Sequence, residues 1–121
     1  MERDVHVINI EDKFEMINDL HAYKVIAQMN DYLFKLVRMK REFIWHKHDE
    51  TDEVFMVVEG TLRIDLRDRR LWLKKGEMVV IPRGVEHKPS CTDECRILLV
   101  EPANTVNTGD AGGGMTDTHL E

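Results

Sequence analysis

Residues 53–67 read Glu-Val-Phe-Met-Val-Val-Glu-Gly-Thr-Leu-Arg-Ile-Asp-Leu-Arg, and this stretch decides the fold class. Val54–Val58 is a short apolar run that ends at the turn pair Glu59-Gly60. In Thr61–Arg67, leucine and isoleucine then alternate with arginine and aspartate. Alternation with a period of two puts the apolar side chains on one face of an extended chain, which is typical of a half-buried β-strand. The stretch therefore predicts two strands separated by a turn.

The same pattern of short apolar segments and turns continues on both sides of this stretch. We expect further strands at residues 22–29, 32–39, 71–73, 77–81 and 95–100. Strands that recur about every eight to twelve residues indicate an antiparallel sandwich or barrel. The absence of long helices between these strands argues against a parallel α/β sheet. We therefore predict an all-β fold.

The segment before these strands has a different pattern. Residues 4–10 alternate weakly and predict a short strand. Ile10, Phe14, Ile17 and Leu20 then recur near helical spacing and predict one short amphipathic helix over residues 10–20. We expect residues 1–21 to form an N-terminal strand and helix segment ahead of the barrel, which we place at residues 22–102.

The last part of the chain has few apolar residues. After Glu101-Pro102 the sequence is rich in threonine, asparagine and aspartate and contains Gly112-Gly113-Gly114. Segments of this composition cannot bury enough apolar surface to fold alone. We therefore predict that residues 103–121 form a Gly-rich tail that is either mobile or orders against a partner.

The overall composition excludes several classes of protein. The 121 residues include 17 basic and 23 acidic side chains, a net charge of −6, and 42% of them are apolar. Net acidity without a dominant basic stretch argues against nucleic-acid binding. No apolar run is long enough to span a bilayer. Because Met1–Asp4 is charged and no apolar segment follows it, we expect no signal peptide and a cytoplasmic location.

The chain has two cysteines, Cys91 and Cys95, on either side of a predicted turn. They could face each other across a hairpin, but two cysteines are too few for a scaffold held by disulfides. A zinc site built on them would lack two nearby ligands. We expect two reduced thiols packed as small apolar groups.

Two histidines stand out by their spacing. In His46-Lys47-His48 an extended chain would send both imidazoles to one face and Lys47 to the other. A polar run then leads to Glu53, and His87 follows the Pro82-Arg83-Gly84 turn. Three imidazoles and one carboxylate suit iron, manganese, nickel, cobalt, copper or zinc, whereas calcium and magnesium prefer oxygen ligands. A six-coordinate ion with four protein ligands would keep two positions open for a substrate.

The spacing of these residues resembles the two conserved-barrel motifs of the cupin superfamily. The first motif reads His46-x-His48, four residues, Glu53, six residues and Gly60. The second reads Gly76, five residues, Pro82-x-Gly84, two residues and His87. The chain is most similar to the small single-domain cupins called mannose-6-phosphate isomerase-like. Two positions depart from the pattern: Lys40 stands where the first motif usually opens with glycine, and Cys91 where the second usually closes with asparagine.

The resemblance implies a jelly roll, the double-stranded β-helix barrel of two antiparallel sheets around a central cavity. It also implies that His46, His48, Glu53 and His87 bind one divalent transition metal. Gly60 and Gly84 would have structural roles in turns. Cupins commonly pair, so the resemblance further implies a homodimer.

Other side chains are candidates for the walls of a substrate pocket. Phe34, Met56 and Met78 could line the cavity beside the metal, although residues of these types more often fill a core. Arg83 and Glu86, in the loop next to His87, could contact a charged substrate. We expect Trp45 to point outward, because it alternates with the histidines.

Three functions remain open at this point. The first is a metal-dependent enzyme, an isomerase or a dioxygenase, that acts on a small oxygenated molecule, either anionic or sugar-like, with Glu53 as the candidate catalytic residue. The second is a non-enzymatic cupin that binds or senses a small molecule. The third is a scaffold that the metal stabilises. A non-enzymatic binder would lack an acid/base group near the metal. A scaffold would lack an accessible cavity.

Overall fold

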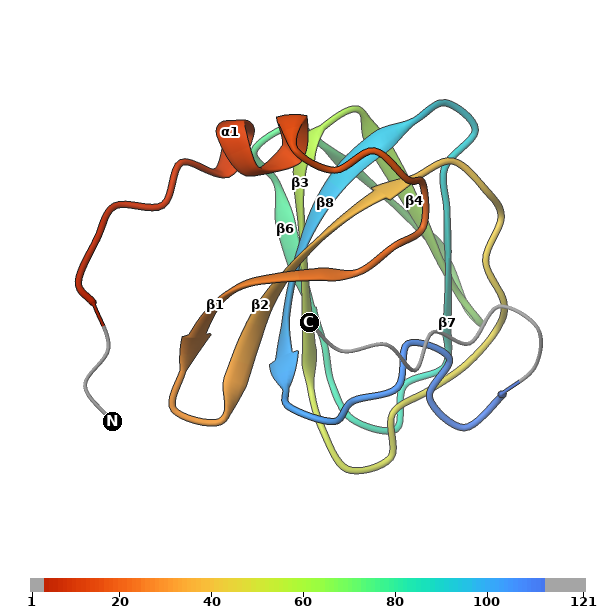
Figure 1. The fold of residues 1–121 in the computed structure, drawn as a ribbon. Helices are drawn as coiled ribbons and strands as arrows, with labels where there is room; N and C mark the ends of the chain where they lie inside the picture. The colour runs from red at the N-terminus through yellow and green to blue at the C-terminus, as the bar shows by residue number, and fades with distance from the viewer. Residues whose placement is uncertain (1–3, 113–121) are drawn as a thin grey trace.

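The computed structural model describes residues 4–112 and shows a barrel of two antiparallel sheets (Figure 1). The strands are β1 (Lys24–Met29), β2 (Tyr32–Met39), β3 (Glu53–Glu59), β4 (Thr61–Leu66), β5 (Arg70–Lys74), β6 (Met78–Ile81), β7 (His87–Ser90) and β8 (Cys95–Pro102). One sheet has the order β1-β2-β8-β3-β6 and the other the order β5-β4-β7. The predicted all-β jelly roll is confirmed.

The core lies between the two sheets and follows the alternation in the sequence. On β3, Phe55 and Val57 are buried, and on β4 the buried apolar residues are Leu62 and Ile64. Gly60 makes the turn between these strands at φ +88°, where a Cβ atom would lie 2.9 Å from Cys95 Cβ. Both the backbone conformation and this close approach require glycine.

The helix α1 (Ile10–Glu15) is shorter than the helix predicted over residues 10–20. Its N-terminus is capped by Asn9, whose side chain accepts a hydrogen bond from Asp12 N. After Glu15 the backbone bonds tighten to a spacing of three residues, Met16 N to Lys13 O and Ile17 N to Phe14 O, and the chain then leaves the helix. Phe14 nevertheless packs where the helical spacing predicts, on the outer face of the five-stranded sheet.

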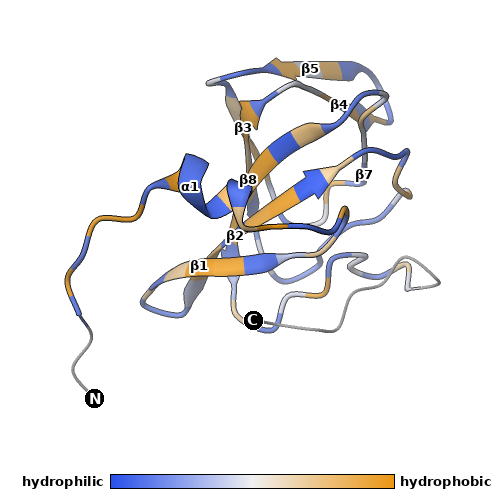
Figure 2. Cartoon of the chain, turned by 45° about the horizontal axis from the view of Figure 1, so that its top comes forward, coloured by the Kyte–Doolittle hydropathy of each residue, from blue (hydrophilic) through white to orange (hydrophobic). Residues whose placement is uncertain are grey.

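The strand predicted over residues 4–10 does not form in the described part of the chain. Residues 4–9 form an extended arm that stands away from the barrel, with Val5 and Val7 fully exposed (Figure 2). The prediction is wrong because no strand within residues 4–112 pairs with this arm and supplies the hydrogen bonds of a ladder.

The segment after β8 is ordered against the barrel as far as the structure describes it. Ala103 N donates to Asp31 O at 2.8 Å, and Asp110 N donates to Lys47 O at 3.1 Å. Thr108 is completely buried. A tail that is mobile or orders only against a partner is therefore the wrong description of residues 103–110. The rest of the predicted tail, residues 113–121, lies outside the described residues, and the division at residues 21 and 102 stays a prediction.

Cys91 and Cys95 form a disulfide, so the prediction of two reduced thiols is wrong. The turn between β7 and β8 brings the two residues to a Cα–Cα separation of 6.4 Å, which is within the range that a disulfide spans.

No helix in residues 4–112 is long and apolar enough to cross a membrane.

Candidate metal centre

The two histidines of the first motif lie in an irregular segment between β2 and β3 and are held by the second motif. His46 N donates to His87 O at 3.0 Å, and His87 N donates to His46 O at 2.9 Å. His48 O accepts a hydrogen bond from Gly84 N at 2.8 Å. The extended course of this segment buries His46 and His48, as the alternation predicts, and leaves Lys47 between them half-exposed.

Glu53 is the first residue of β3, and its side chain points into the barrel with those of Phe55 and Val57. The turn that precedes Glu53 is tied to the second motif, because the Asp52 carboxylate accepts a hydrogen bond from Arg83 N at 2.8 Å. Glu53 thereby reaches the three histidines. The structure brings all four residues together: one potential ligand atom from each of His46, His48, Glu53 and His87 lies within 4.8 Å of the others.

The ring orientations leave bare nitrogen lone pairs in the middle of this cluster. His46 Nδ1 lies 3.0 Å from Ile44 O, and His87 Nδ1 lies 2.9 Å from Val85 O. A carbonyl oxygen only accepts hydrogen bonds, so both Nδ1 atoms carry the proton and both Nε2 atoms are unprotonated in the neutral ring.

Three buried polar atoms converge without hydrogen-bond partners in the described residues. His48 Nε2 and His87 Nε2 each lie 3.4 Å from Glu53 Oε1, and none of these three buried atoms makes a hydrogen bond within the described part of the chain. Buried acceptors without partners are costly, and a shared cation relieves that cost. The donor set of nitrogen and carboxylate oxygen suits a first-row divalent metal. The residues present thus fit a metal ion, and the arrangement is a possible metal site of three histidines and one glutamate.

The electrostatics of the cluster favour a neutral imidazole at His46. Burial is the main cause that lowers the pKa of His46 to about 4, and the neighbouring His87 adds to the effect. A metal ligand must be unprotonated, so the site is prepared to bind a cation near neutral pH without first losing a proton from His46.

The carboxylate of Glu53 is ionised. Burial alone would raise its pKa, but the polar side chains around it outweigh burial and hold the pKa well below the usual range. The buried cluster therefore contains a negative charge that a divalent cation would balance.

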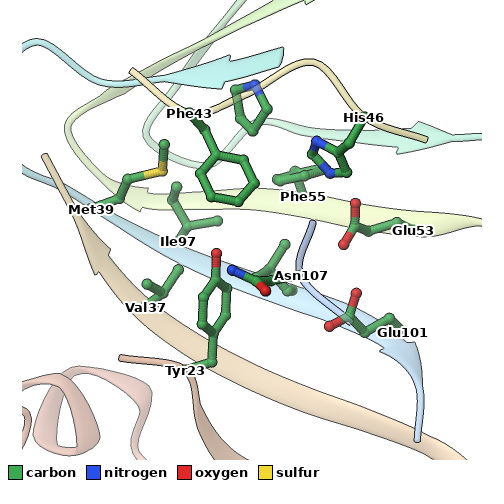
Figure 3. Close-up of a pocket in the computed structure, with 12 residues that line it drawn as sticks. Tyr23, Val37, Met39, Phe43, His46, Glu53, Phe55, Ile97, Glu101 and Asn107 are labelled. Carbon is green, nitrogen blue, oxygen red and sulfur yellow. The ribbon is translucent and has the colours of Figure 1, made fainter. Parts of the chain in front are cut away.

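A second carboxylate, Glu101, lies next to Glu53 in the barrel (Figure 3). Burial and the charge of Glu53 raise the pKa of Glu101 well above its usual value. Lys35 opposes this effect: its Nζ lies 2.9 Å from Glu101 Oε1, and both side chains are buried. The sequence interpretation missed this pair, although Lys35 stands in register with Val37 and Met39 on the inward face of β2 and is the charged residue in that alternation.

A small cavity adjoins the cluster (Figure 3). Its polar lining consists of Tyr23, His46, Glu53, Glu101 and Asn107, and its apolar lining consists of Val37, Met39, Phe43, Phe55, Pro89, Ile97 and Leu99. The cavity volume is about 20 Å³, which is room for one water-sized group. Burial raises the pKa of the Tyr23 phenol to about 12, against the opposing effect of a hydrogen bond with Asn107. Neither Tyr23 nor Asn107 carries a motif that could have identified it from the sequence.

Phe34, Met56 and Met78 do not lie beside the histidines. They line a separate, apolar groove on the outer face of the five-stranded sheet. The physical reason is the alternation itself: Glu53, Phe55 and Val57 point inward on β3, so Met56 must point outward. The expectation that these three residues wall the metal cavity is therefore wrong.

Arg83 and Glu86 also lie outside the cavity that contains Glu53. Glu86 is exposed and forms an ion pair with Arg67 at 3.1 Å, whereas Arg83 is exposed next to the turn before β3. Trp45 points outward as predicted, and its ring is covered by the Arg67 guanidinium, with 3.8 Å from Cζ to the ring centroid. Glu86 lines a separate hollow with Arg67 and Val85, which contains none of the four candidate ligands, and the roles of Arg83 and Glu86 as substrate contacts stay predictions.

Comparison with known proteins agrees with this fold. Residues 35–101 match the cupin domain family. A cupin-2 domain protein from Shewanella frigidimarina is 56% identical, with a TM-score of 0.78 over 79% of this chain and 94% of that chain. The protein NMB1881 from Neisseria meningitidis is 28% identical, with a TM-score of 0.73 over 81% of this chain and 100% of that chain. The matched region is more than half of the chain, and the chain therefore belongs to the cupin family.

Two curated relatives match over shorter stretches. The Bacillus subtilis protein YdbB is 36% identical over 73 residues, which are 60% of this chain and 65% of that protein. Acireductone dioxygenase 3 from Arabidopsis thaliana is 39% identical over 57 residues, which are 43% of this chain and 28% of that enzyme. The chain thus spans just under two thirds of YdbB and less than a third of the dioxygenase.

Proposed function

We propose that this cupin binds one divalent transition metal through His46, His48, Glu53 and His87 and uses it to act on a small oxygenated molecule. The observation that carries the proposal is the convergence of three buried acceptors, His48 Nε2, Glu53 Oε1 and His87 Nε2, that have no hydrogen-bond partner in residues 4–112. When bound, the metal would act as a Lewis acid that polarises oxygens of the substrate.

We infer that the chemistry is of the dioxygenase or isomerase type. Two observations support an enzyme over a passive binder. Glu101 is a second carboxylate within the cavity, where it could exchange a proton with a bound molecule. The sequence similarity to acireductone dioxygenase 3 favours the dioxygenase alternative. Glu53 is the candidate catalytic residue only through its role as a ligand. Membership of the mannose-6-phosphate isomerase-like group stays a prediction.

Metal analysis tests the metal proposal. The full chain, purified without added metal and without a histidine tag, should contain close to one equivalent of a first-row metal by mass spectrometry. His87→Ala should contain far less, because the site loses one of its ligands. His6→Ala is the matched control, since His6 lies on the exposed N-terminal arm, and it should keep the metal of the wild type. If wild type and His87→Ala bind the same amount of metal, the proposal is wrong.

A scaffold that the metal stabilises is the second candidate function, and the small cavity is the observation that favours it. A scaffold would be stabilised by metal but would bind no small molecule. Titration of the metal-loaded protein with oxygenated probes therefore separates the two functions, and the next section specifies those probes.

We propose that the active species is a homodimer that pairs through the outer face of the five-stranded sheet. This face carries an apolar groove lined by Ile26, Phe34, Val54, Met56 and Met78 among others, with almost no polar surface. The N-terminal arm adds the exposed side chains of Val5 and Val7. Each copy thus offers an apolar groove and an apolar arm. A second copy could cover both surfaces, because it presents the same apolar groove and arm in return.

The cytoplasmic location stays a prediction, and the Cys91–Cys95 disulfide is the observation that opposes it. Disulfides persist in oxidising compartments, whereas cytosolic thiols are kept reduced. An alkylating reagent can trap free thiols in intact cells before mass analysis of the protein. This measurement decides between the cytoplasm and an oxidising compartment. Two alkylated cysteines would support the cytoplasm, and an unmodified pair would support an oxidising compartment.

A further inference from the structure

The walls of the metal cavity differ sharply in character. Aliphatic, thioether and aromatic side chains cover most of the surface: Val37, Met39, Phe43, Phe55, Ile97 and Leu99. The carboxylates of Glu53 and Glu101 lie at one side with His46, whereas Tyr23 and Asn107 lie between that side and the apolar residues Val37 and Ile97 (Figure 3). A molecule in this cavity would therefore have its oxygens at one end and an apolar group at the other.

The charges around the cavity argue against a phosphorylated ligand. Among residues 4–112, no lysine or arginine lines the cavity, and its two carboxylates are those of Glu53 and Glu101. The lysine next to this pair, Lys35, is already bound to Glu101 at 2.9 Å. A phosphate group away from the metal would meet carboxylates and apolar walls and would find no cation of its own.

The apolar walls also argue against a sugar. Each hydroxyl group that loses its hydrogen bonds with water on burial weakens binding unless the protein replaces those bonds. The polar side chains of the lining are few and are already engaged in part, Tyr23 with Asn107 and Glu101 with Lys35. A short alkyl chain, in contrast, gains affinity with each methylene group that it buries.

The segment that carries Asn107 controls the size of the cavity. Asn107 and Thr108 are buried, yet they belong to a turn segment after β8 and not to either sheet. Gly109, the next residue, packs against the backbone of Lys47. The cavity holds about 20 Å³, so a ligand larger than water must displace part of its lining, and Asn107 is the lining residue that belongs to neither sheet.

We propose, on the basis of the metal function above, that the cavity is the binding site for a compact ligand that chelates through vicinal oxygens and carries a short apolar tail. A short-chain 2-oxo acid has this chemistry. The walls select against phosphorylated and polyhydroxylated compounds, and Val37 and Ile97 are specificity-determining residues that contact the tail.

Calorimetric titration of the full-length, zinc-loaded protein tests this inference. We expect 2-oxobutanoate to bind at least tenfold more tightly than 3-phosphoglycerate, which has vicinal oxygens but carries a phosphate. Val37→Thr places a hydroxyl group in the apolar wall at almost constant volume and should weaken 2-oxobutanoate binding about fivefold. Val58→Thr is the matched control, because Val58 lies on the opposite face of the same sheet and outside the apolar groove, and it should leave this binding unchanged.

A second variant keeps the test decisive if Val37→Thr folds poorly. Ile97→Val enlarges the cavity by one methylene group and should shift the preference from 2-oxobutanoate toward 2-oxopentanoate about threefold. Equal affinity for 2-oxobutanoate and 3-phosphoglycerate would overturn the inference. An affinity that neither wall substitution changes would overturn it as well. Both outcomes leave the metal proposal standing. A chain that retains no zinc would overturn the proposed function, and this inference with it.

Discussion

The backbones of His46 and His87 hold each other directly through two hydrogen bonds of 3.0 and 2.9 Å. One residue lies in the irregular segment after β2 and the other begins β7, so this pair is the point where the two halves of the candidate site meet. Because the main chain makes both bonds, a substitution of either side chain leaves the pairing possible. Variants at these positions therefore test the chemistry of the ligands more than the fold.

Removal of metal should lower the melting temperature of the wild-type protein. A ligand that binds only the folded state stabilises it by about 2.7 kcal/mol when its free concentration is about 100 times its Kd. Calorimetric melting with and without EDTA measures the difference. In His87→Ala the melting temperature should be the same in both conditions. A wild-type melting temperature that does not respond to chelation would contradict a stabilising metal.

The stability of the metal-free protein should fall as the pH decreases from 6.5 to 4. The pKa of His46 is about 4 in the fold, against 6.5 for an ordinary histidine, so the unfolded chain binds the proton first. The contribution of His46 to the free energy of unfolding is fully present above pH 6.5 and is lost by pH 4. This contribution amounts to about 3 kcal/mol. Urea unfolding at a series of pH values measures this change. His46→Gln should flatten the dependence by the same amount, and an equal slope in both proteins would exclude His46 as its origin.

Replacement of Lys35 by methionine should destabilise the protein strongly. The substitution keeps the length of the side chain but leaves Glu101 buried next to Glu53 without its cation. Because the pKa of Glu101 is already raised, the carboxyl would be protonated in this variant, and the loss of its buried hydrogen bond lowers the free energy of unfolding by about 1–3 kcal/mol. The double variant Lys35→Met with Glu101→Leu should recover much of that loss, because no unpaired polar group remains. A single variant as stable as the wild type in urea would show that the pair contributes nothing.

Gly109→Ala should loosen the segment that covers the metal cavity. A Cβ atom at this position would collide with the carbonyl oxygen of Lys47, and the backbone has φ +53°. Gly112→Ala is the matched control, since its φ is +64° and a Cβ atom there meets nothing within 4 Å. Each variant bears the strain of a left-handed residue, about 1 kcal/mol, but only Gly109→Ala must displace the segment. Stopped-flow release of zinc to a chromophoric chelator should be faster in Gly109→Ala alone, and equal rates in the two variants would argue that the segment does not limit access.

Met78→Lys should dissociate the proposed dimer. Met78 is 55% exposed in the apolar groove, so a lysine there is tolerated by the monomer but is disfavoured in an apolar interface. Trp72→Lys is the matched control, because Trp72 is 60% exposed on β5 of the other sheet. Sedimentation velocity should show a monomer only for Met78→Lys. A wild-type protein that sediments as a monomer would refute pairing through this face.

Much of the fold could be predicted from local patterns. The alternation of Leu62 and Ile64 with charged residues identifies β4, because period-two burial depends only on the geometry of an extended chain. The same reasoning failed at Val5 and Val7, which alternate but pair with no strand of the described chain. A strand needs hydrogen bonds from a neighbour, and a local pattern does not reveal whether a neighbour exists.

By itself, the sequence determined the barrel and the group of possible metal ligands, because strand periodicity and the spacing of His46, His48, Glu53 and His87 are properties of the chain read in order. Only the tertiary structure decided what surrounds those ligands. It placed Met56 on the outer face, paired Lys35 with Glu101, and brought Glu101 and Asn107 to the cavity from separate segments. The physical reason is that a cavity exists only after the two sheets close on each other, and its walls are then chosen by strand register and by the path of the chain after β8.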